Sequence, residues 1–176
     1  MMKSGYYLIA FLFFSYWANA QQGGFDQKAV DSVSGDSILI GYVTRDSLQG
    51  SVFCSWFSKN YREYHPDQDV LSELMTHSDL WRSIRITVIM ATWSGQSRVQ
   101  IARFFKFLDN LQCYGKCTII ALDRQQRAGP VPIGELKITQ IPTIIFFRKG
   151  MEIGRITGTP KITLEEDFYK IVKTER

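Results

Sequence analysis

Two serines in one short turn are the side chains of this sequence that are best placed to do chemistry. Ser94 and Ser97 lie between a run of apolar, β-branched residues at 84–91 and a run with helical spacing at 98–111. The start of a helix offers unpaired backbone N–H groups and the positive end of the helix dipole. A hydroxyl group there can act as a nucleophile if a base lies beside it, or it can cap the helix.

A serine nucleophile has no support elsewhere in the sequence. The two histidines, His65 and His77, both precede the strand, and nothing places either of them beside Ser94. The Gly-x-Ser-x-Gly pattern of a nucleophile elbow is absent. We therefore predict that Ser94 is the N-cap of the following helix and that Ser97 is a polar residue of its first turn.

Three cysteines are the other candidates for chemistry. Cys113 and Cys117 are separated by residues that can turn tightly, so they either form a local disulfide or remain two independent thiols. Because the number of cysteines is odd, at least one thiol is left over or pairs between chains. Cys54 lies in an aromatic run, and we expect it to be buried and inert. Without a second cysteine pair or a nearby histidine, the zinc pattern is incomplete, so we predict no metal and no cofactor.

Composition and charge indicate one globular domain rather than a disordered chain. The 176 residues are 45% hydrophobic and 14% aromatic, which is enough apolar material for a sizeable core. The formal net charge is +4 and becomes +3 if Lys3 is removed with a leader. So small a charge does not indicate nucleic-acid binding, and we predict no nucleic-acid partner.

The first 20 residues have the form of a secretory signal peptide. Lys3 provides the positive start, residues 6–17 are apolar, and the Ala-Asn-Ala at 18–20 fits a cleavage signal. An uncleaved membrane anchor is the alternative, although the apolar run is shorter than the roughly 20 residues that a span needs. We therefore expect an exported protein, periplasmic or secreted, with no membrane span after the signal is removed. Disulfides can persist in such a compartment.

The rest of the chain divides into three predicted parts. Residues 21–43 are a leader or arm, in which 21–36 is polar and expected to be flexible and 37–43 is a short strand or an extended arm. Residues 44–80 are a helical, aromatic N-terminal module that we expect to pack over one end of a sheet. Residues 81–176 are the main domain. Its predicted elements are strand 84–91, helix 98–111, strand 117–122, a short helix at 133–137, strands 144–148 and 151–157, and a helix that begins at 164.

Polar residues mark the points where several helices should begin. Thr44 opens a group of N-cap candidates before a run of helical spacing that ends near residues 60–61 and is broken by the Tyr-His-Pro of 64–66. Asp67 is placed to cap a second helix. Thr163 and Glu166 form a capping box before the C-terminal helix.

The order of these elements and two motifs within it resemble the thioredoxin superfamily, in which a βαβ half precedes a ββα half. The Trp-Ser-Gly-Gln-Ser at 93–97 stands where that superfamily has Trp-Cys-x-x-Cys between its central strand and a long helix. The Ile-Pro-Thr at 141–143 stands where it has a cis-proline before a strand, and Gly154 matches a glycine of its final hairpin. The resemblance covers about residues 41–172. It implies an α/β, thioredoxin-like three-layer fold, with a central mixed sheet flanked by helices and a helical N-terminal extension.

One exported bacterial subgroup of this superfamily is similar in more detail. It carries Trp-Cys-Gly/Ser-Asp-Ser followed by Arg, and here Ser97 and Arg98 match the last two residues. The resemblance implies a thiol–disulfide oxidoreductase with a part in cell redox homeostasis. However, Ser94 replaces the attacking cysteine, Ser97 stands at the position of the resolving cysteine, and Gln96 replaces the aspartate. Since an oxygen cannot form the mixed disulfide that thiol exchange requires, the motif is degenerate.

The resemblance implies a groove at this site that contains no nucleophile. In the superfamily, the residue before the cis-proline offers backbone hydrogen bonds to an extended substrate. The resemblance therefore implies a redox-inactive module that binds an extended peptide or protein segment by strand-like pairing. The groove residues would be Trp93, Gly95, Gln96, Ile141 and Pro142.

Two alternatives remain open from the sequence. In the first, the protein is a thiol enzyme that acts through Cys54 or through Cys113 and Cys117. In the second, Ser94 stands in place of the cysteine of a monothiol thioredoxin-like enzyme and marks the position of its nucleophile.

Overall fold

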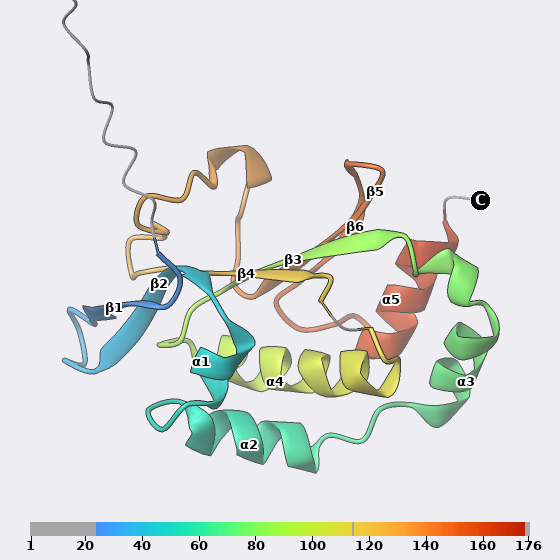
Figure 1. Ribbon diagram of the computed structural model, residues 1–176, viewed down its shortest axis with the longest axis horizontal. Coiled ribbons are helices and arrows are strands. Elements are labelled where there is room, and N and C mark those ends of the chain that lie inside the picture. The colour runs from blue at the N-terminus through green and yellow to red at the C-terminus, as the bar shows by residue number, and fades with distance from the viewer. Residues whose placement is uncertain (1–23, 114, 175–176) are drawn as a thin grey trace, which may run out of the picture.

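A mixed sheet with the strand order β1-β2-β4-β3-β5-β6 forms the centre of the molecule. The structure is a computed structural model that describes residues 24–113 and 115–174 (Figure 1). Strand β3 runs parallel to β4 and antiparallel to β5, which gives the predicted βαβ half followed by a ββα half. The strands are β1 (Gln27–Val30), β2 (Ser37–Val43), β3 (Ile84–Met90), β4 (Cys117–Ala121), β5 (Thr143–Arg148) and β6 (Met151–Thr157).

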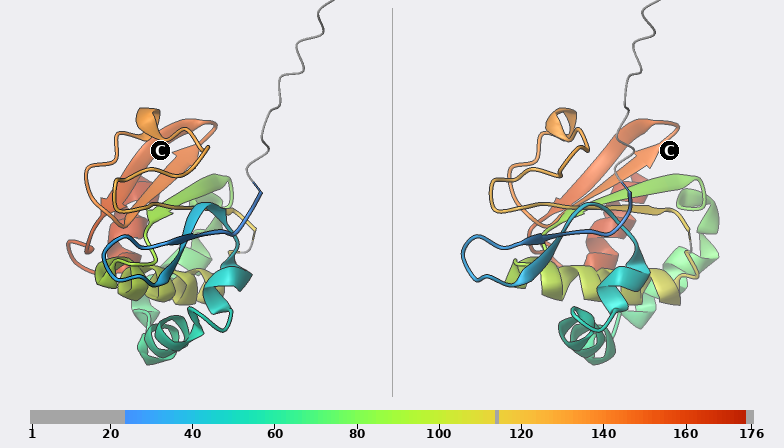
Figure 2. Two further views of the ribbon diagram at one scale, coloured as in Figure 1. Left: turned by 90° about the vertical axis from the view of Figure 1, so that its left-hand side faces the viewer. Right: turned by 60° about the vertical axis from the view of Figure 1, so that its left-hand side comes forward.

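Helices cover one face of this sheet much more thickly than the other. Figures 1 and 2 show α4 and α5 against one face, with α2 on the outer side of α4. The other face is covered by the segment 123–142, whose single helical turn is the 3₁₀ turn η2 (Gly134–Leu136). The predicted α/β class with a central mixed sheet is confirmed. The remaining helices are α1 (Arg45–Gln49), α2 (Cys54–Glu63), α3 (Gln68–Thr76), the 3₁₀ turn η1 (Ser78–Leu80), α4 (Gly95–Asn110) and α5 (Leu164–Lys173).

Aromatic side chains join the sheet to its two principal helices. Phe104 and Phe107 of α4, Phe146 of β5 and Phe168 of α5 are all fully buried. The Phe146 and Phe168 rings meet edge-on at 5.3 Å between centroids, and the Phe107 and Phe168 rings do so at 5.2 Å. Because such edge-on pairs add to the stability that apolar burial provides, this cluster fixes α4, and the turn before it, relative to the sheet.

The predicted N-caps are present at the helices that matter for the site. The Ser94 side chain accepts a hydrogen bond from the Ser97 N–H at the start of α4. Asp67 and Thr163 cap α3 and α5 in the same way. Each satisfies a backbone N–H that a helix start would otherwise leave unpaired.

The prediction of a flexible leader at 21–36 is wrong for the part that the structure describes. Residues 27–30 form β1, which pairs antiparallel with β2 and places a hairpin at one edge of the sheet. The side chain of Asp31, in the turn of this hairpin, is buried and bonded to Arg124, 93 residues later. Polar composition indicated flexibility, but a long-range ion pair orders the hairpin. The predicted signal peptide at 1–20 lies outside the described residues.

The N-terminal helical module does not cap an end of the sheet. Its helix α2 lies along α4 instead, and Leu48, Phe57 and Leu74 belong to the same apolar core as the sheet. The helical run divides at Gly50, the C-cap of α1, so two helices replace one. Among the described residues, no helix is long and apolar enough to cross a membrane.

Candidate functional site

Both serine hydroxyls of the turn between β3 and α4 accept hydrogen bonds from the backbone. Ser94 Oγ accepts from the N–H of Ser97 at 3.3 Å. Ser97 is fully buried, and its Oγ accepts from the N–H of Ala91 at 3.2 Å. The second bond satisfies a backbone donor at the end of the central strand, which would be costly to leave unpaired in the core. Ser97 is therefore part of the fold rather than a group that a ligand can reach.

Trp93 is held in place at both its edge and its face. Its indole N–H donates to the carbonyl of Leu122, at the end of β4, over 2.9 Å. The guanidinium carbon of Arg124 lies 4.2 Å from the Trp93 ring centroid, well within the range of a cation–π contact. Arg124 is in turn bonded to Asp31 in the N-terminal hairpin. Trp93 is thus partly exposed but has a fixed orientation.

The cis-proline loop leaves one residue with unpaired backbone groups. The Ile141–Pro142 peptide bond is cis, and the Pro142 carbonyl accepts from the N–H of Gly158 at 2.7 Å. Thr143 Oγ1 donates to the carbonyl of Gln140. By contrast, the N–H and C=O of Ile141 have no hydrogen-bond partner within 24–113 and 115–174. These two groups are free to pair with an added extended chain.

Gly158 is the point where α4 and the cis-proline loop meet. Its backbone has a positive φ of 68°, and a Cβ there would collide with the Gln140 side chain and approach Gln96 Nε2 to 3.2 Å. Gln96 Nε2 also donates to Thr159 Oγ1 at 2.9 Å. The positive φ favours glycine at this position, and a side chain here would also displace the end of the Gln140 side chain. Gly95 differs, because a Cβ there would meet nothing within 4 Å, so the surface beside the turn is open.

The structure links parts of the predicted groove, and the full set of five residues stays a prediction. Gln96 and Pro142 both contact Gly158, while Ile141 packs against the small apolar cluster that contains Leu122, the hydrogen-bond partner of Trp93. Neither Arg124 nor Asp31 is predicted as a site residue from the sequence. The position of Arg124, two residues after a strand end, was a weak signal, and Asp31 had none.

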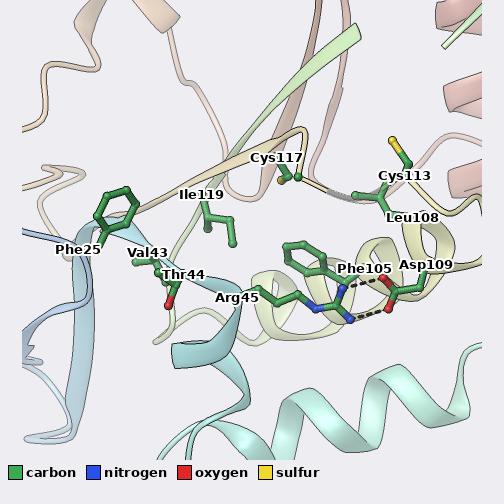
Figure 3. Close-up of a pocket in the computed structure, with 11 residues that line it drawn as sticks. Phe25, Val43, Thr44, Arg45, Phe105, Leu108, Asp109, Cys113, Cys117 and Ile119 are labelled. Atoms are coloured by element: carbon green, nitrogen blue, oxygen red, sulfur yellow. Dashed lines mark hydrogen bonds and ion pairs between the residues drawn. The ribbon is translucent and has the colours of Figure 1, made fainter. Parts of the chain in front are cut away.

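The three cysteines have free thiols. The local disulfide that the spacing of Cys113 and Cys117 allowed is not formed, and Figure 3 shows the two side chains apart on either side of a turn. Cys54 is half-exposed rather than buried, because it begins α2 beside the inward-facing Phe53 and Phe57. No group of three or more potential metal ligands occurs among the residues that the structure describes.

Cys113 and Cys117 line a cavity of about 380 Å³ between α4 and β4 (Figure 3). Burial raises the pKa of the Cys113 thiol, and it raises that of Cys117 to about 12. Thiol exchange requires the thiolate. These two groups are therefore poorly suited to nucleophilic chemistry at neutral pH.

An ion pair forms the polar wall of the same cavity. Arg45 donates to both oxygens of Asp109 (Figure 3). In addition, Tyr61 OH donates to Asp109 Oδ2 at 2.6 Å. Burial acts to raise the pKa of Asp109, but the hydrogen bonds from Arg45 and Tyr61 lower it below its ordinary value. This network ties α1 and α2 to α4.

The solved structures that are similar to this chain include several thioredoxins. No protein-family model and no curated protein sequence matches the chain. A thioredoxin from Fasciola hepatica is similar in structure at 16% identity, over 60% of this chain and 91% of that one, with a TM-score of 0.38. Oxidised thioredoxin O2 from Arabidopsis thaliana is similar at 25% identity, over 52% of this chain and 73% of that one, with a TM-score of 0.34.

Mitochondrial thioredoxin 3 from Saccharomyces cerevisiae, in its oxidised form, is also similar. Its identity is 22%, over 50% of this chain and 77% of that one, with a TM-score of 0.33. These similarities concern the fold alone.

Proposed function

We propose that this thioredoxin-fold chain is an exported, redox-inactive binding module that holds an extended peptide segment at the surface of Trp93, Gly95, Gln96, Ile141 and Pro142. The observation that carries the proposal is the pair of unpaired backbone groups of Ile141 beside the cis-proline. An extended segment placed there can exchange main-chain hydrogen bonds with Ile141 and lay a side chain against Trp93.

The hydrogen bonds of the two serines support a function without redox chemistry. An alkoxide at Ser94 would need a base, and no histidine contacts it among the described residues. Ser97 is buried and bonded to the main chain. The turn therefore offers shape and hydrogen bonds, which suits recognition.

Thiol exchange through Cys113 and Cys117 is the competing function. The cavity that both cysteines line is the feature in its favour. Their raised pKa values weigh against it, since the reactive thiolate would be scarce. Cys54 is half-exposed, but it forms no disulfide with Cys113 or Cys117.

Binding of a permanently unfolded protein tests the proposal. Fluorescein-labelled, reduced and carboxymethylated α-lactalbumin serves as the probe, with anisotropy as the readout. We expect saturable binding that Trp93→Ala weakens about tenfold, because a truncated tryptophan anchor often costs this much. Gly95→Tyr, which adds bulk where there is open space, should weaken it as well. Met151→Ala, at an exposed turn, is the matched control.

Two results would contradict the proposal. One is absence of binding, or binding that neither Trp93→Ala nor Gly95→Tyr changes while both variants keep the native circular dichroism spectrum. The other is reduction of insulin by the wild-type chain above the rate of dithiothreitol alone.

A further inference from the structure

The indole of Trp93 is stacked against one arginine, and that arginine is itself fixed. Arg124 Nε donates to Asp31 Oδ1 at 2.9 Å, and its Nη2 donates to Asp31 Oδ2 at 2.7 Å. Such a two-point contact restricts the guanidinium to a single plane. The central carbon of this guanidinium lies 4.2 Å from the centroid of the Trp93 ring, so the contact with Asp31 also fixes how Arg124 lies against the indole.

Burial and further hydrogen bonds fix the position of the Asp31 carboxylate that binds this arginine. Its side chain is buried, at 1% relative exposure for the residue, and also accepts from the Val33 N–H and the Ser34 hydroxyl. The hydrogen bond from Arg124 is the main reason that the pKa of this carboxyl lies well below its usual range. Asp31 is therefore ionised wherever the protein is folded near neutral pH.

The hairpin that carries Asp31 contacts the turn at a second point. The Leu39 N–H of β2 donates to Thr92 Oγ1 at 3.1 Å, and both residues are fully buried. Thr92 immediately precedes Trp93. The N-terminal hairpin is thus a structural part of the Trp93 surface, joined to it by one backbone contact and one ion pair.

Arg124 keeps one donor group for a ligand. Its Nη1 has no partner in the described part of the chain, and 30% of its side chain is exposed. The buried carboxylate occupies the other edge of the guanidinium. An acceptor that reaches the Trp93 ring therefore meets a free N–H group with a fixed direction.

The bordering segments together carry a net positive charge. Residues 93–96, 123–127, 139–142 and 158–161 contain Arg127 and Lys161 as further cations. The acidic residue among them, Asp123, accepts hydrogen bonds from the Arg127 side chain and from backbone N–H groups. An incoming carboxylate would meet donors rather than an unpaired like charge.

We infer that Arg124, held by Asp31 against Trp93, determines the specificity of this surface, and that the bound extended segment carries an acidic side chain beside the Trp93 contact. The inference rests on the proposed function and specifies its ligand. Arg124 acts both as a positioning residue for the indole and as the donor to the ligand carboxylate.

Two matched peptides test the inference. Both peptides carry a fluorescein label and are built from threonine and valine, with a third residue at every third position. That residue is glutamate in one peptide and glutamine in the other. We expect the glutamate peptide to bind about two- to fivefold more tightly at low salt, the range for a partly exposed ion pair. High salt should remove this preference, because it screens exposed charges.

The variants separate specificity from folding. Arg124→Gln and Asp31→Asn should abolish the preference, while Arg127→Gln, a neighbouring exposed arginine, should leave most of it. Arg124→Lys keeps the charge but loses the two-point contact, so it should retain only part of the preference. The near-ultraviolet circular dichroism spectrum of each variant reports whether the aromatic core is intact.

The outcomes distinguish the two proposals. If neither peptide nor the unfolded protein binds, the proposed function fails. If both peptides bind equally and Trp93→Ala weakens both, the function stands and the acidic specificity is overturned. Retention of the preference in folded Arg124→Gln also overturns it.

Discussion

Replacing Ser94 by cysteine tests whether the fold still activates a thiol at its helix start. Ser94 caps the sixteen-residue helix α4 and is partly exposed, with open space beside it at Gly95. The helix dipole stabilises a negative charge at this position by about 0.3–1 kcal/mol. That energy corresponds to roughly two- to fivefold more thiolate at neutral pH than the same cysteine has when unfolded. The N–H of Ser97 acts in the same direction.

The same substitution should destabilise the protein. A sulfur atom is a weak acceptor, so the Ser97 N–H loses most of its cap. Losing a serine N-cap costs about 0.5–2 kcal/mol. We therefore expect the free energy of unfolding in urea to fall by about 1 kcal/mol, with the fold retained.

Iodoacetamide alkylation measures the introduced thiol directly. Peptide-resolved mass spectrometry separates it from the three native cysteines, and the same chain in denaturant gives the unfolded rate. Ser72→Cys, exposed in the middle of α3, is the matched control. The pH at which alkylation of Ser94→Cys reaches half its maximum should lie below that of the control. Equal pH profiles would refute the reasoning. Insulin reduction should stay at background, because position 97 still has no sulfur.

Three further predictions concern stability. Ser97→Ala leaves a buried backbone N–H unpaired and should lower the free energy of unfolding by about 1–3 kcal/mol in urea titrations, with no loss if the bond is unimportant. Gly158→Ala must place a side chain at a positive φ and displace the end of Gln140, so its melting temperature should fall, whereas Gly95→Ala should not lower it. Burial raises the pKa of Glu165, so its contribution to the free energy of unfolding is present at low pH and is lost as pH rises above 4.5. Glu165→Gln should therefore make the free energy of unfolding fall less steeply with pH, and an unchanged pH profile would contradict the assignment.

Local patterns in the sequence predicted the strand and the helix on either side of the candidate site with little error. The β-branched run at 84–91 predicted β3, and the polar cap at Ser94 predicted the start of a helix. The helix begins at Gly95, three residues earlier than its apolar spacing indicated, because the first turn of α4 carries small and polar residues. Helix caps and strand propensity act over a few residues, so they can be read from a short stretch.

Residue type alone was a poorer guide to the environment of single side chains. Cys54 lies among aromatic residues in the sequence, yet its side chain is half-exposed, because it lies at the edge of the buried face of α2. The polar residues before β2 were expected to be flexible, but they form a hairpin around a buried aspartate. In both cases a neighbouring segment, distant in the sequence, decides what is buried.

The sequence by itself determined that sulfur is absent from Ser94 and Ser97, and hence that thiol exchange cannot occur there. Only the tertiary structure decided that Ser97 accepts a hydrogen bond from the end of the central strand. It also decided that Ile141 keeps unpaired backbone groups beside the proline. It also decided that Asp31 holds the arginine on Trp93. The physical reason is that elemental composition limits covalent chemistry at once, whereas hydrogen-bond partners are chosen only when the chain folds.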